Sequence, residues 1–567
     1  MTARPAAPAG TTEARIRALL QRAIKLHQAG NLAPARAIYE DILAVEPEHF
    51  DALQLSGVLA AQRGDPTQAL RRYEQAIAID ARQAPLHCNK GSALCALGRW
   101  HAALACYDQA LALQPGNAAA HFNRGNAFCA LGRFDAALED FERAVAIDGA
   151  LAEAHSKRAH ALCQLGRFEA AIVGCNAALA LRPRLAEALC VRGNAERALD
   201  RLDAAVSSYR QAIAAQPDYP DALCNLGNVL RELEQLDAAI GCYDRAVEMH
   251  PDFAEGHFAR SIALLLGGDY ERGWRDYEWR WRCRSGTARE CRSLRAPLWL
   301  GKETLADKTV LLHAEQGLGD SLQFCRYIGA VAERGARVIL EVHQPLMRLL
   351  SQLPGVSQLI ARGSELPHFD LHCPLMSLPL ALGTAGSIPA PVRLRAEPAS
   401  VQRWRNRLPR GGPRVGLVFS GSAVHPNDRH RSIPLADWIP HLPGGLQYIA
   451  LQRDMRARDR EVQSAHPCIT SCGDELRDFA DTAALCELLD LVICVDTSIA
   501  HLCGSMGVRT WLLLPFNPDW RWLLGRQDSP WYPSITLYRQ RKVGDWREVL
   551  AQVGAHLCAL RGGGGRE

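Results

Sequence analysis

One small residue recurs every 34 positions through the first half of the chain, and this spacing constrains the fold more than any other feature. It occupies eight successive registers: Ala23, Gly57, Gly91, Gly125, Ala159, Gly193, Gly227 and Ser261. A second small residue and a bulky residue four positions later share the period, as in Ala103 with Tyr107 and Ala205 with Tyr209. Such a period is typical of stacked helical hairpins, in which each unit buries its apolar face against its neighbours.

Turn residues fall where such hairpins need them. Glycines end the predicted first helices and prolines follow the second helices: Gly30, Gly64, Gly98, Gly132, Gly166, Pro47, Pro115, Pro183, Pro217 and Pro251. Glycine closes a helix readily, and proline cannot continue one. The combined pattern resembles the tetratricopeptide repeat from residue 16 to about residue 287, which implies an α-solenoid with a concave binding face.

Asparagines recur on the predicted first helices, at the sixth and ninth positions of the repeat. They are Asn89, Asn123, Asn126, Asn194, Asn225 and Asn228. Amide side chains offer paired donors and acceptors, so a ladder of them can hold the backbone of an extended protein or peptide. A similar ladder marks the repeat half of O-GlcNAc transferase, where it holds extended protein substrates. The alternative is that these positions face solvent and merely tolerate asparagine.

The charge of the chain and the absence of long apolar runs exclude several classes of protein. The 65 Lys and Arg residues nearly balance the 61 Asp and Glu residues, whereas a nucleic-acid surface needs concentrated positive charge. No run approaches the roughly 18 apolar residues of a transmembrane helix, and the start of the chain lacks the apolar core of a secretory signal. We therefore expect a cytoplasmic protein with no nucleic-acid partner and no transmembrane segment.

The pattern changes after the eighth register, where Trp274, Tyr277, Trp279 and Trp281 crowd together. Because a solenoid must cap its open end, we expect these aromatics to pack the array against the following domain. From Lys308, short apolar runs alternate with helical patterns, as in parallel sheets flanked by helices. The predicted organisation is a disordered tail (1–15), the repeat array (16–287), a linker (288–304), two α/β lobes (305–408 and 409–560) and a second disordered tail (561–567).

Seven apolar runs in the second half are predicted strands. They are Val310–His313, Arg337–Val342, Phe369–His372, Arg414–Phe419, Gln447–Leu451, Leu491–Val495 and Thr510–Leu514. A break rich in Pro and Gly at 408–413 separates the first three from the rest. Two such units in tandem predict an α/β module of GT-B type, with two Rossmann-like lobes and a cleft at the carboxyl ends of the strands.

The loop after the first predicted strand carries Gln316, Gly317, Gly319 and Asp320. Its glycines let backbone amides approach a ligand closely, and the helix that begins near Ser321 adds positive dipole. Asp320 is either the carboxylate that caps this helix or a general base facing the cleft. The loop resembles that of heptosyltransferase-like bacterial glycosyltransferases, which implies that Asp320 deprotonates an acceptor hydroxyl.

A second motif stands at a predicted helix start. Asp496, Thr497 and Ser498 follow the strand Leu491–Val495, and His501 lies one turn later. Free N–H groups at a helix start suit a diphosphate, and small hydroxyl side chains add donors. An N-cap by Asp496 or Thr497 would explain one of these polar residues but not the run. The segment resembles the Asp-(Ser/Thr)-(Gly/Ser)-x-x-His signature of the same family, which implies that it grips a nucleotide sugar.

A third loop pairs small polar residues with arginines: Ser420, Gly421, Ser422, Arg429 and Arg431. Arginine in a cleft neutralises the charge on a departing nucleoside diphosphate when no metal does so. In heptosyltransferase-like enzymes a basic residue after a similar loop holds this phosphate. The resemblance implies the same role for Arg429 or Arg431, of which Arg431 is the nearer counterpart.

A fourth loop follows the strand Thr510–Leu514. Asp519 is its candidate sugar contact, whereas Trp520 and Trp522 beside it are expected to pack against the other lobe. Together the loops predict a metal-independent, inverting glycosyltransferase that moves a sugar from a nucleotide-sugar donor to an acceptor recruited by the array. No cofactor and no metal are expected. The alternative is a noncatalytic repeat scaffold with a degenerate transferase-like half, since a fold does not guarantee a function.

Overall fold

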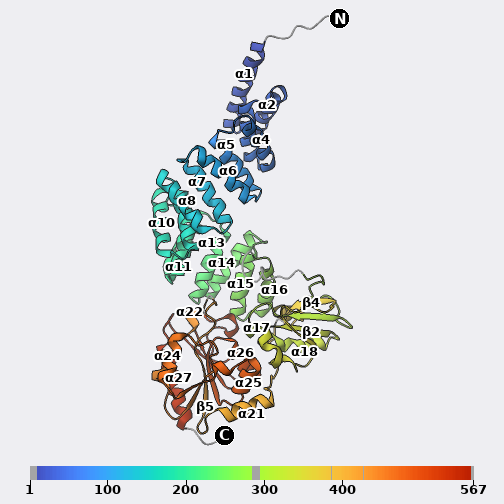
Figure 1. Ribbon diagram of the computed structural model, residues 1–567, viewed down its shortest axis with the longest axis vertical. Coiled ribbons are helices and arrows are strands. Elements are labelled where there is room, and N and C mark those ends of the chain that lie inside the picture. The colour runs from blue at the N-terminus through green and yellow to red at the C-terminus, as the bar shows by residue number, and fades with distance from the viewer. Residues whose placement is uncertain (1–8, 284–293, 385, 426, 563–567) are drawn as a thin grey trace. The chain divides into compact units, whose positions relative to one another are not determined.

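The computed structural model describes residues 9–283, 294–384, 386–425 and 427–562 (Figure 1). The chain divides into two compact units, Met1–Val229 and Leu230–Glu567. This division falls inside the repeat array, whereas the sequence suggests a linker at 288–304. The second unit therefore contains the last repeats together with the α/β part.

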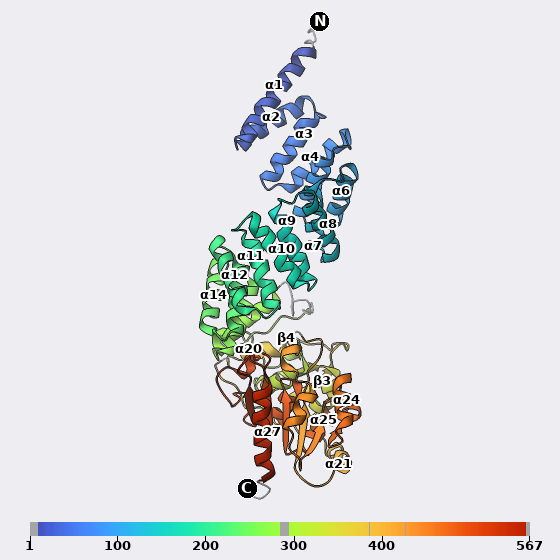
Figure 2. The ribbon, with the colours of Figure 1, turned by 90° about the vertical axis from the view of Figure 1, so that its left-hand side faces the viewer.

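The first unit is built of helical hairpins that follow one another along the chain (Figure 2). Their helices are α1 (Ala9–Gln28), α2 (Leu32–Val45), α3 (Phe50–Gln62), α4 (Pro66–Ile79), α5 (Ala84–Ala96), α6 (Trp100–Leu113), α7 (Ala118–Ala130), α8 (Phe134–Ile147), α9 (Ala152–Gln164), α10 (Phe168–Leu181), α11 (Ala186–Ala198), α12 (Leu202–Ala215) and α13 (Pro220–Glu232), whose end enters the second unit. The predicted helical array is confirmed over these residues.

The repeat period has a direct steric cause. A Cβ atom built on Gly91 would lie 2.6 Å from the ring of Tyr107, and the equivalent atom on Gly125 would lie 2.7 Å from the ring of Phe141. The small residue on the first helix thus leaves room for the bulky side chain on the second helix of the same hairpin. Between the two helices, Gly98 adopts a left-handed conformation with φ of +70°, which glycine reaches without a side-chain clash. The small residues of one sequence period therefore contact the bulky residues of the other.

The chain is already helical inside the tail predicted at 1–15. Helix α1 begins at Ala9 and buries Ile16, Leu20 and Ala23. These three residues lie on one helical face, which packs in the core of the first hairpins. Residues 1–8 lie outside the described residues, as do residues 563–567 of the second predicted tail, where helix α27 (Arg547–Gly562) ends.

The second unit begins with the remaining repeats and continues into two parallel sheets. Helices α14 (Leu236–Met249), α15 (Ala254–Leu266) and α16 (Tyr270–Tyr277) are followed by the 3-10 turn η1 (Glu278–Trp281). The first sheet has the order β3-β2-β1-β4 and the second the order β10-β9-β8-β5-β6-β7. Within these sheets each strand pairs in parallel with its neighbours.

All seven predicted strands are present, and three others were missed. The strands are β1 (Thr309–His313), β2 (Arg337–Val342), β3 (Val356–Ala361), β4 (Leu371–Pro374), β5 (Arg414–Val418), β6 (Gln447–Ala450), β7 (Ile469–Ser471), β8 (Leu491–Val495), β9 (Thr510–Leu514) and β10 (Ile535–Arg539). The missed strands β3, β7 and β10 are sheet edges. Edge strands are short or only partly buried, so they lack the continuous apolar run that marks a central strand.

Helices cover both faces of the second sheet. In Figure 1, α24 (Ala457–Ala465) and α27 lie on one side of β5, and α25 (Phe479–Cys486) and α26 (Ser498–Met506) lie on the other. The strand residues divide accordingly between two apolar clusters, one of which includes α27 and the other α25 and α26. The C-terminal half is thus an α/β module, as predicted.

The last repeats share a hydrophobic core with the α/β part. This core includes Leu265 and Trp274 together with Val310 of β1 and Leu514 of β9. The ring centroid of Trp274 lies 5.6 Å from that of Phe324 and 5.3 Å from that of Trp520. The predicted packing of the array's final aromatics against the following domain is confirmed for Trp274.

Part of the predicted linker 288–304 is ordered against the first sheet. Leu298 forms an isolated parallel bridge with His372 of β4, and Trp299 is buried. Residues 288–293 lie outside the described residues. Within the described part of the chain, no helix is long and apolar enough to cross a membrane.

Candidate functional site

Two helix starts face each other in the second unit, each at the carboxyl end of a central strand. Helix α17 (Leu318–Phe324) follows β1, and α26 follows β8. A Cβ atom built on Gly319 would lie 2.8 Å from Cδ2 of His501 and 3.5 Å from Cα of Ser498. The structure therefore brings the first and second sequence motifs into contact, with glycine required at the point of closest approach.

Both carboxylate oxygens of Asp320 are engaged. Oδ2 accepts a hydrogen bond from the backbone N–H of Gly317 at 2.7 Å, which is the capping contact that the sequence allows. Oδ1 pairs with the guanidinium of Arg521 in the loop after β9. The Asp320 side chain is 18% exposed. Burial raises the pKa of Asp320, and the positive charge of Arg521 opposes this rise.

Arg521 is a site residue that the sequence analysis missed. Its Nη1 donates to Oδ1 of Asp519 at 2.8 Å, and its Nε donates to Oε1 of Gln323 at 2.5 Å. Its guanidinium lies 4.3 Å from the centroid of the Trp520 ring. Asp519, the predicted sugar contact, is thus a member of an ion-pair network. The available signal was charge, since Arg521 is the one cation between Pro515 and Trp522.

The third loop lies beside the start of α26. Nη1 of Arg431 donates to the backbone carbonyl of Asp496 at 2.9 Å. A Cβ atom on Gly421 would lie 2.6 Å from Nη2 of Arg431, so a larger residue at this position would displace the guanidinium. Arg429 instead is exposed, and its Nε lies 2.8 Å from Nε2 of His430. The geometry therefore groups Arg431, and not Arg429, with the second motif.

Three buried polar atoms at this place have no protein partner among the described residues. They are Oγ of Ser420, Oγ1 of Thr497 and Nε of Arg431. Buried polar groups in folded proteins are nearly always hydrogen-bonded. Donors left open side by side are expected where a ligand or ordered water completes their bonds. Ser422 differs from these residues because it is exposed.

The pKa values of Asp496 and His501, both in the second motif, are strongly shifted. Burial raises the pKa of Asp496 to about 7, and the nearby negative charge of Asp519 adds to the rise. Burial also holds the pKa of His501 well below its ordinary value, aided by Arg521 and Arg326. Nδ1 of His501 lies 3.1 Å from the Tyr532 hydroxyl, and its ring stacks on Trp522. The His501 imidazole is therefore held in a buried position between Tyr532 and Trp522.

The remaining predicted site residues are Gln316, in the loop after β1, and the asparagines of the repeat array. Nε2 of Gln316 donates to the hydroxyl of Tyr277 at 2.9 Å. In the array, Oδ1 of Asn194 accepts from Nδ2 of Asn225 at 3.1 Å and from the Tyr209 hydroxyl at 2.7 Å. The other ladder residues lie half-buried on the first helices: Asn89 on α5, Asn123 and Asn126 on α7, and Asn228 on α13. Trp520 and Trp522 are buried, as expected of packing residues.

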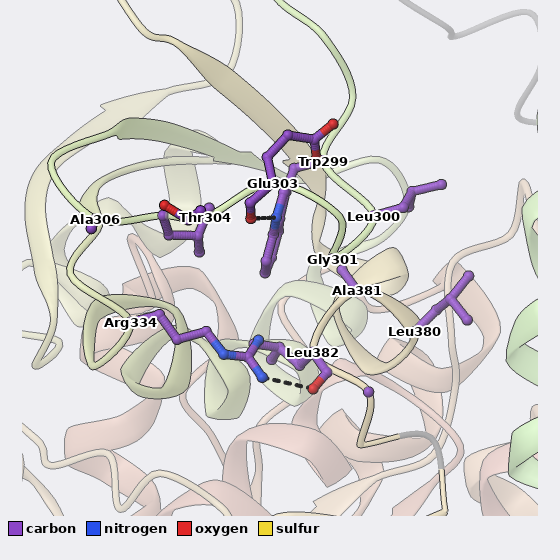
Figure 3. Close-up of a pocket in the computed structure, with 12 residues that line it drawn as sticks. Trp299, Leu300, Gly301, Glu303, Thr304, Ala306, Arg334, Leu380, Ala381 and Leu382 are labelled. Carbon is purple, nitrogen blue, oxygen red and sulfur yellow. Dashed lines mark hydrogen bonds between the residues drawn. The ribbon is translucent and has the colours of Figure 1, made fainter.

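A pocket of about 550 Å³ lies outside this site, near the amino ends of the strands of the first sheet (Figure 3). Trp299, Leu305 and Arg334 are among the residues that line it, and Arg334 donates to the carbonyl of Leu382 at 2.8 Å. Ligands of parallel α/β sheets bind at the carboxyl ends of strands, and this pocket is at the amino ends. Its described lining includes no predicted site residue. The described residues also contain no group of three or more His, Cys, Asp or Glu placed to hold a metal ion.

Comparison with known families identifies the array. A tetratricopeptide-repeat model matches residues 20–85 and 88–152, a TPR-repeat model matches 193–233, and a second tetratricopeptide-repeat model matches 220–253. The chain therefore carries tetratricopeptide repeats, as the period predicts.

Among curated proteins, the chain is similar to Protein FlbA of Caulobacter vibrioides, with 27% identity over 333 residues. The match covers 53% of this chain and 54% of FlbA. The chain thus spans about half the length of this relative.

Solved structures that resemble the chain include the APC/C hetero-tetramer Cut9-Hcn1, with 17% identity and a TM-score of 0.38 over 47% of this chain and 52% of that chain. YrrB, described as a TPR protein with an unusual peptide-binding site, has 24% identity and a TM-score of 0.28 over 34% of this chain and 98% of its own. A thermophilic TPR protein of Thermus thermophilus has 26% identity and a TM-score of 0.30, over 32% of this chain and 100% of its own.

Proposed function

We propose that the α/β part of the second unit is a GT-B glycosyltransferase. It would move a sugar, without a metal and with inversion, from a nucleotide-sugar donor to an acceptor recruited by the repeats. The observation that carries the proposal is the convergence of the loops after β1, β5 and β8, two of which hold open, buried donors. The resemblance of these loops to heptosyltransferase-like enzymes supports the same function.

The donor would bind between the loops after β5 and β8. Ser420, Thr497 and Arg431 supply the open donors, and the free N–H groups at the start of α26 add a positive dipole. Negative charge grows on the phosphate oxygen as its bond to the sugar breaks. A preorganised arginine stabilises this charge more in the transition state than in the bound donor, which is what accelerates the reaction.

The acceptor would react from the side of Asp320. The acceptor oxygen bonds to the anomeric carbon while the bond from that carbon to the phosphate oxygen breaks. The electron pair leaves with the nucleotide, and the hydroxyl proton passes to the Asp320 carboxylate. A single in-line displacement inverts the anomeric centre. The positive charge of Arg521 favours the ionised form of Asp320, because it opposes the effect of burial on the Asp320 pKa.

The array would present the acceptor. Tetratricopeptide repeats form extended surfaces that bind other molecules, and the asparagines from Asn89 to Asn228 lie on four first helices of the array, α5, α7, α11 and α13. Asn194 and Asn225 are hydrogen-bonded to each other, so a bound peptide backbone would add to or replace this bond. A protein or peptide is the partner that this surface fits best.

Turnover of nucleotide sugars by the full chain tests the proposal. UDP-, GDP-, ADP- and CMP-sugars are supplied with candidate acceptor peptides, and release of the free nucleotide is measured. We expect one donor class to be turned over. Asp320→Asn should lower kcat by about 10²- to 10⁴-fold, the usual contribution of a general base, and leave the donor affinity unchanged. The absence of turnover and of binding for every donor would remove the proposal.

A noncatalytic scaffold is the second candidate, and one observation favours it. Both oxygens of Asp320 are already bonded, to Gly317 and to Arg521, and these bonds stabilise the ionised carboxylate and lower its tendency to take a proton. Donor binding by the wild-type chain without any nucleotide release would support the scaffold. Equal turnover by Asp320→Asn and wild type would retain the enzyme but reject the general base.

A further inference from the structure

The last repeat hairpin contacts loops from both sheets at the proposed transferase site. Helix α16 and the turn η1 carry Trp274, Tyr277 and Arg280. All three side chains are buried, and each contacts a residue of the loop that carries Asp320 or of the loop that carries Arg521. The two partners of that pair come from different sheets, so one short helical segment supports both.

Arg280 holds the loop after β1. Its Nη2 donates to Oε2 of Glu315 at 2.9 Å and to Oγ of Ser377 at 2.7 Å, and its Nη1 donates to Oε1 of Glu278 at 2.8 Å. The Arg280 side chain is 0% exposed, and its guanidinium lies about 4.5 Å from the Tyr277 ring centroid. A buried arginine whose two terminal nitrogens pair with carboxylates is costly to disturb, because its removal leaves those carboxylates uncompensated.

Tyr277 holds Gln316, the next residue of the loop after β1. Its hydroxyl accepts the hydrogen bond from Gln316 and donates to Sδ of Met376. Glu315 and Gln316 directly precede Gly317, whose N–H binds Asp320. The turn that carries Asp320 is therefore fixed from the side of the last repeat.

Trp274 supports the opposite partner. Its ring meets the Trp520 ring edge to face, with centroids 5.3 Å apart and planes at 89°. Trp520 also contacts the Trp531 ring, with centroids 5.9 Å apart, and the Arg521 guanidinium, which lies 4.3 Å from the Trp520 centroid. An arginine above an aromatic ring is held in position as well as stabilised, so Trp274 fixes Arg521 through Trp520.

We propose that the last repeat is a positioning element of the transferase site: Arg280 and Tyr277 fix the turn of Asp320, and Trp274 fixes Arg521. The last hairpin thus belongs both to the repeat array and to the support of the transferase site. Displacement of this hairpin is expected to separate Asp320 from Arg521. The effect on catalysis rests on the proposed function. The effect on the loop does not, because it follows from the contacts alone.

Hydrogen exchange of the full chain tests this positioning. In Arg280→Ala, amide exchange within residues 315–321 should rise by about tenfold or more, since the loop loses its ion pair. The control is Arg275→Ala in the same hairpin, whose side chain is 67% exposed and pairs only weakly with Glu271. Exchange in strands β1 and β8 should be unchanged in both variants.

Tyr277→Phe is the milder variant, because it removes one hydroxyl and leaves the ring. It should raise exchange in the same segment by a smaller factor, and Arg280→Lys should fall between Arg280→Ala and the wild type, since lysine keeps the charge but not the fork of donors. Unchanged exchange at 315–321 in both Arg280→Ala and Tyr277→Phe would overturn the proposal. Increased exchange throughout the second unit in Tyr277→Phe would overturn it as well, because that pattern marks a general loss of stability.

Catalysis supplies the second readout. With a donor that the wild type turns over, Arg280→Ala should lower kcat by about tenfold or more and leave the donor KM unchanged, whereas Arg275→Ala should match the wild type. An equal kcat in Arg280→Ala would overturn the coupling to catalysis. If no donor is turned over, the proposed function fails while the exchange result still decides whether the hairpin positions the loop.

Discussion

Asp496 has a pKa of about 7 because burial and the charge of Asp519 disfavour its ionised form. It precedes the open hydroxyl of Thr497 and offers its carbonyl to Arg431. Its charge state therefore sets the local potential for an anionic ligand. Below this pKa the side chain is neutral and the positive charge of Arg431 dominates, whereas above it the new carboxylate repels phosphate.

This charge change predicts a pH-dependent affinity. Binding of the nucleotide that the chain accepts should weaken as the pH rises through about 7, since Asp496 ionises over that range. Asp496→Asn should bind with an affinity that changes little between pH 6 and pH 8, as measured by calorimetric titration at constant ionic strength. The same pH dependence in Asp496→Asn and in the wild type would assign the effect to another group.

At the residue scale, the sequence predicts that a ligand approaches the backbone at Gly319 and that Gly421 belongs to the donor loop. In the structure both glycines lie against side chains from elsewhere in the site, namely His501 and Arg431. Arg521 was missed because its partner Asp320 belongs to a distant segment, 201 residues earlier in the chain. Local spacing carries no information about such a pair.

At the scale of elements, an arginine cluster joins helices of both lobes. Asp481 on α25 accepts hydrogen bonds from Arg348 of α19 (Met347–Leu350), Arg403 of α21 (Pro398–Arg407) and Arg477. The Asp481 side chain is 0% exposed. Although burial alone would raise the pKa of Asp481, these three arginines hold it below its ordinary value.

Asp481→Asn should therefore lower the free energy of unfolding by about 2–3 kcal/mol, since it leaves three arginines without a shared partner. The matched control is Asp474→Asn, whose side chain is 78% exposed and should matter little. Because the folded pKa is depressed, this contribution is present above the unfolded pKa near 4 and is lost as the pH falls further. Urea unfolding at pH 7 and pH 3 measures both effects, and an equal change in the two variants would reject the role of the cluster.

The sequence predicts two kinds of element correctly: those that are stabilised by residues close in the chain, and those whose residues are all buried. Each hairpin depends on its own small and bulky residues, such as Gly91 and Tyr107, so the period alone specifies it. Central strands such as β8 are apolar throughout. The edge strand β3 has two consecutive exposed residues, Ser357 and Gln358, and Ile360 is its one buried residue, so its pairing depends on the sheet and not on its own composition.

At the scale of the whole molecule, the boundary between compact units does not follow the boundary between sequence patterns. The repeat period continues to Gly273, but the second unit begins at Leu230. The reason is that Leu265, Trp274 and Tyr277 belong to the core of the α/β part. A repeat that packs against a sheet and a repeat that packs against another repeat have the same periodic residues, so the period alone does not locate this boundary. The aromatics around Trp274 indicate the contact with the following domain but not the residue at which the second unit begins.

This boundary predicts how fragments behave. A fragment of residues 230–567 should unfold cooperatively, because it keeps the shared core. A fragment of residues 297–567 should melt at a lower temperature, since it loses Trp274 and exposes the rings of Phe324 and Trp520. Thermal melts followed by circular dichroism compare the two. A fragment 297–567 that is as stable as 230–567 would show that the last repeats are not part of this unit.

The central claim is that the loops after β5 and β8 hold a nucleotide sugar, and Arg431 and Arg429 provide the most direct test of it. Calorimetric titration of UDP, GDP, ADP and CMP into the full chain measures the affinity of each nucleotide. We expect one of them to bind, with an affinity that Arg431→Ala weakens by about tenfold or more, because this guanidinium lies beside the start of α26. Arg429→Ala should bind like the wild type, since that side chain is exposed and lies against His430. Binding of none of the four nucleotides, or equal losses in the two variants, would contradict the account.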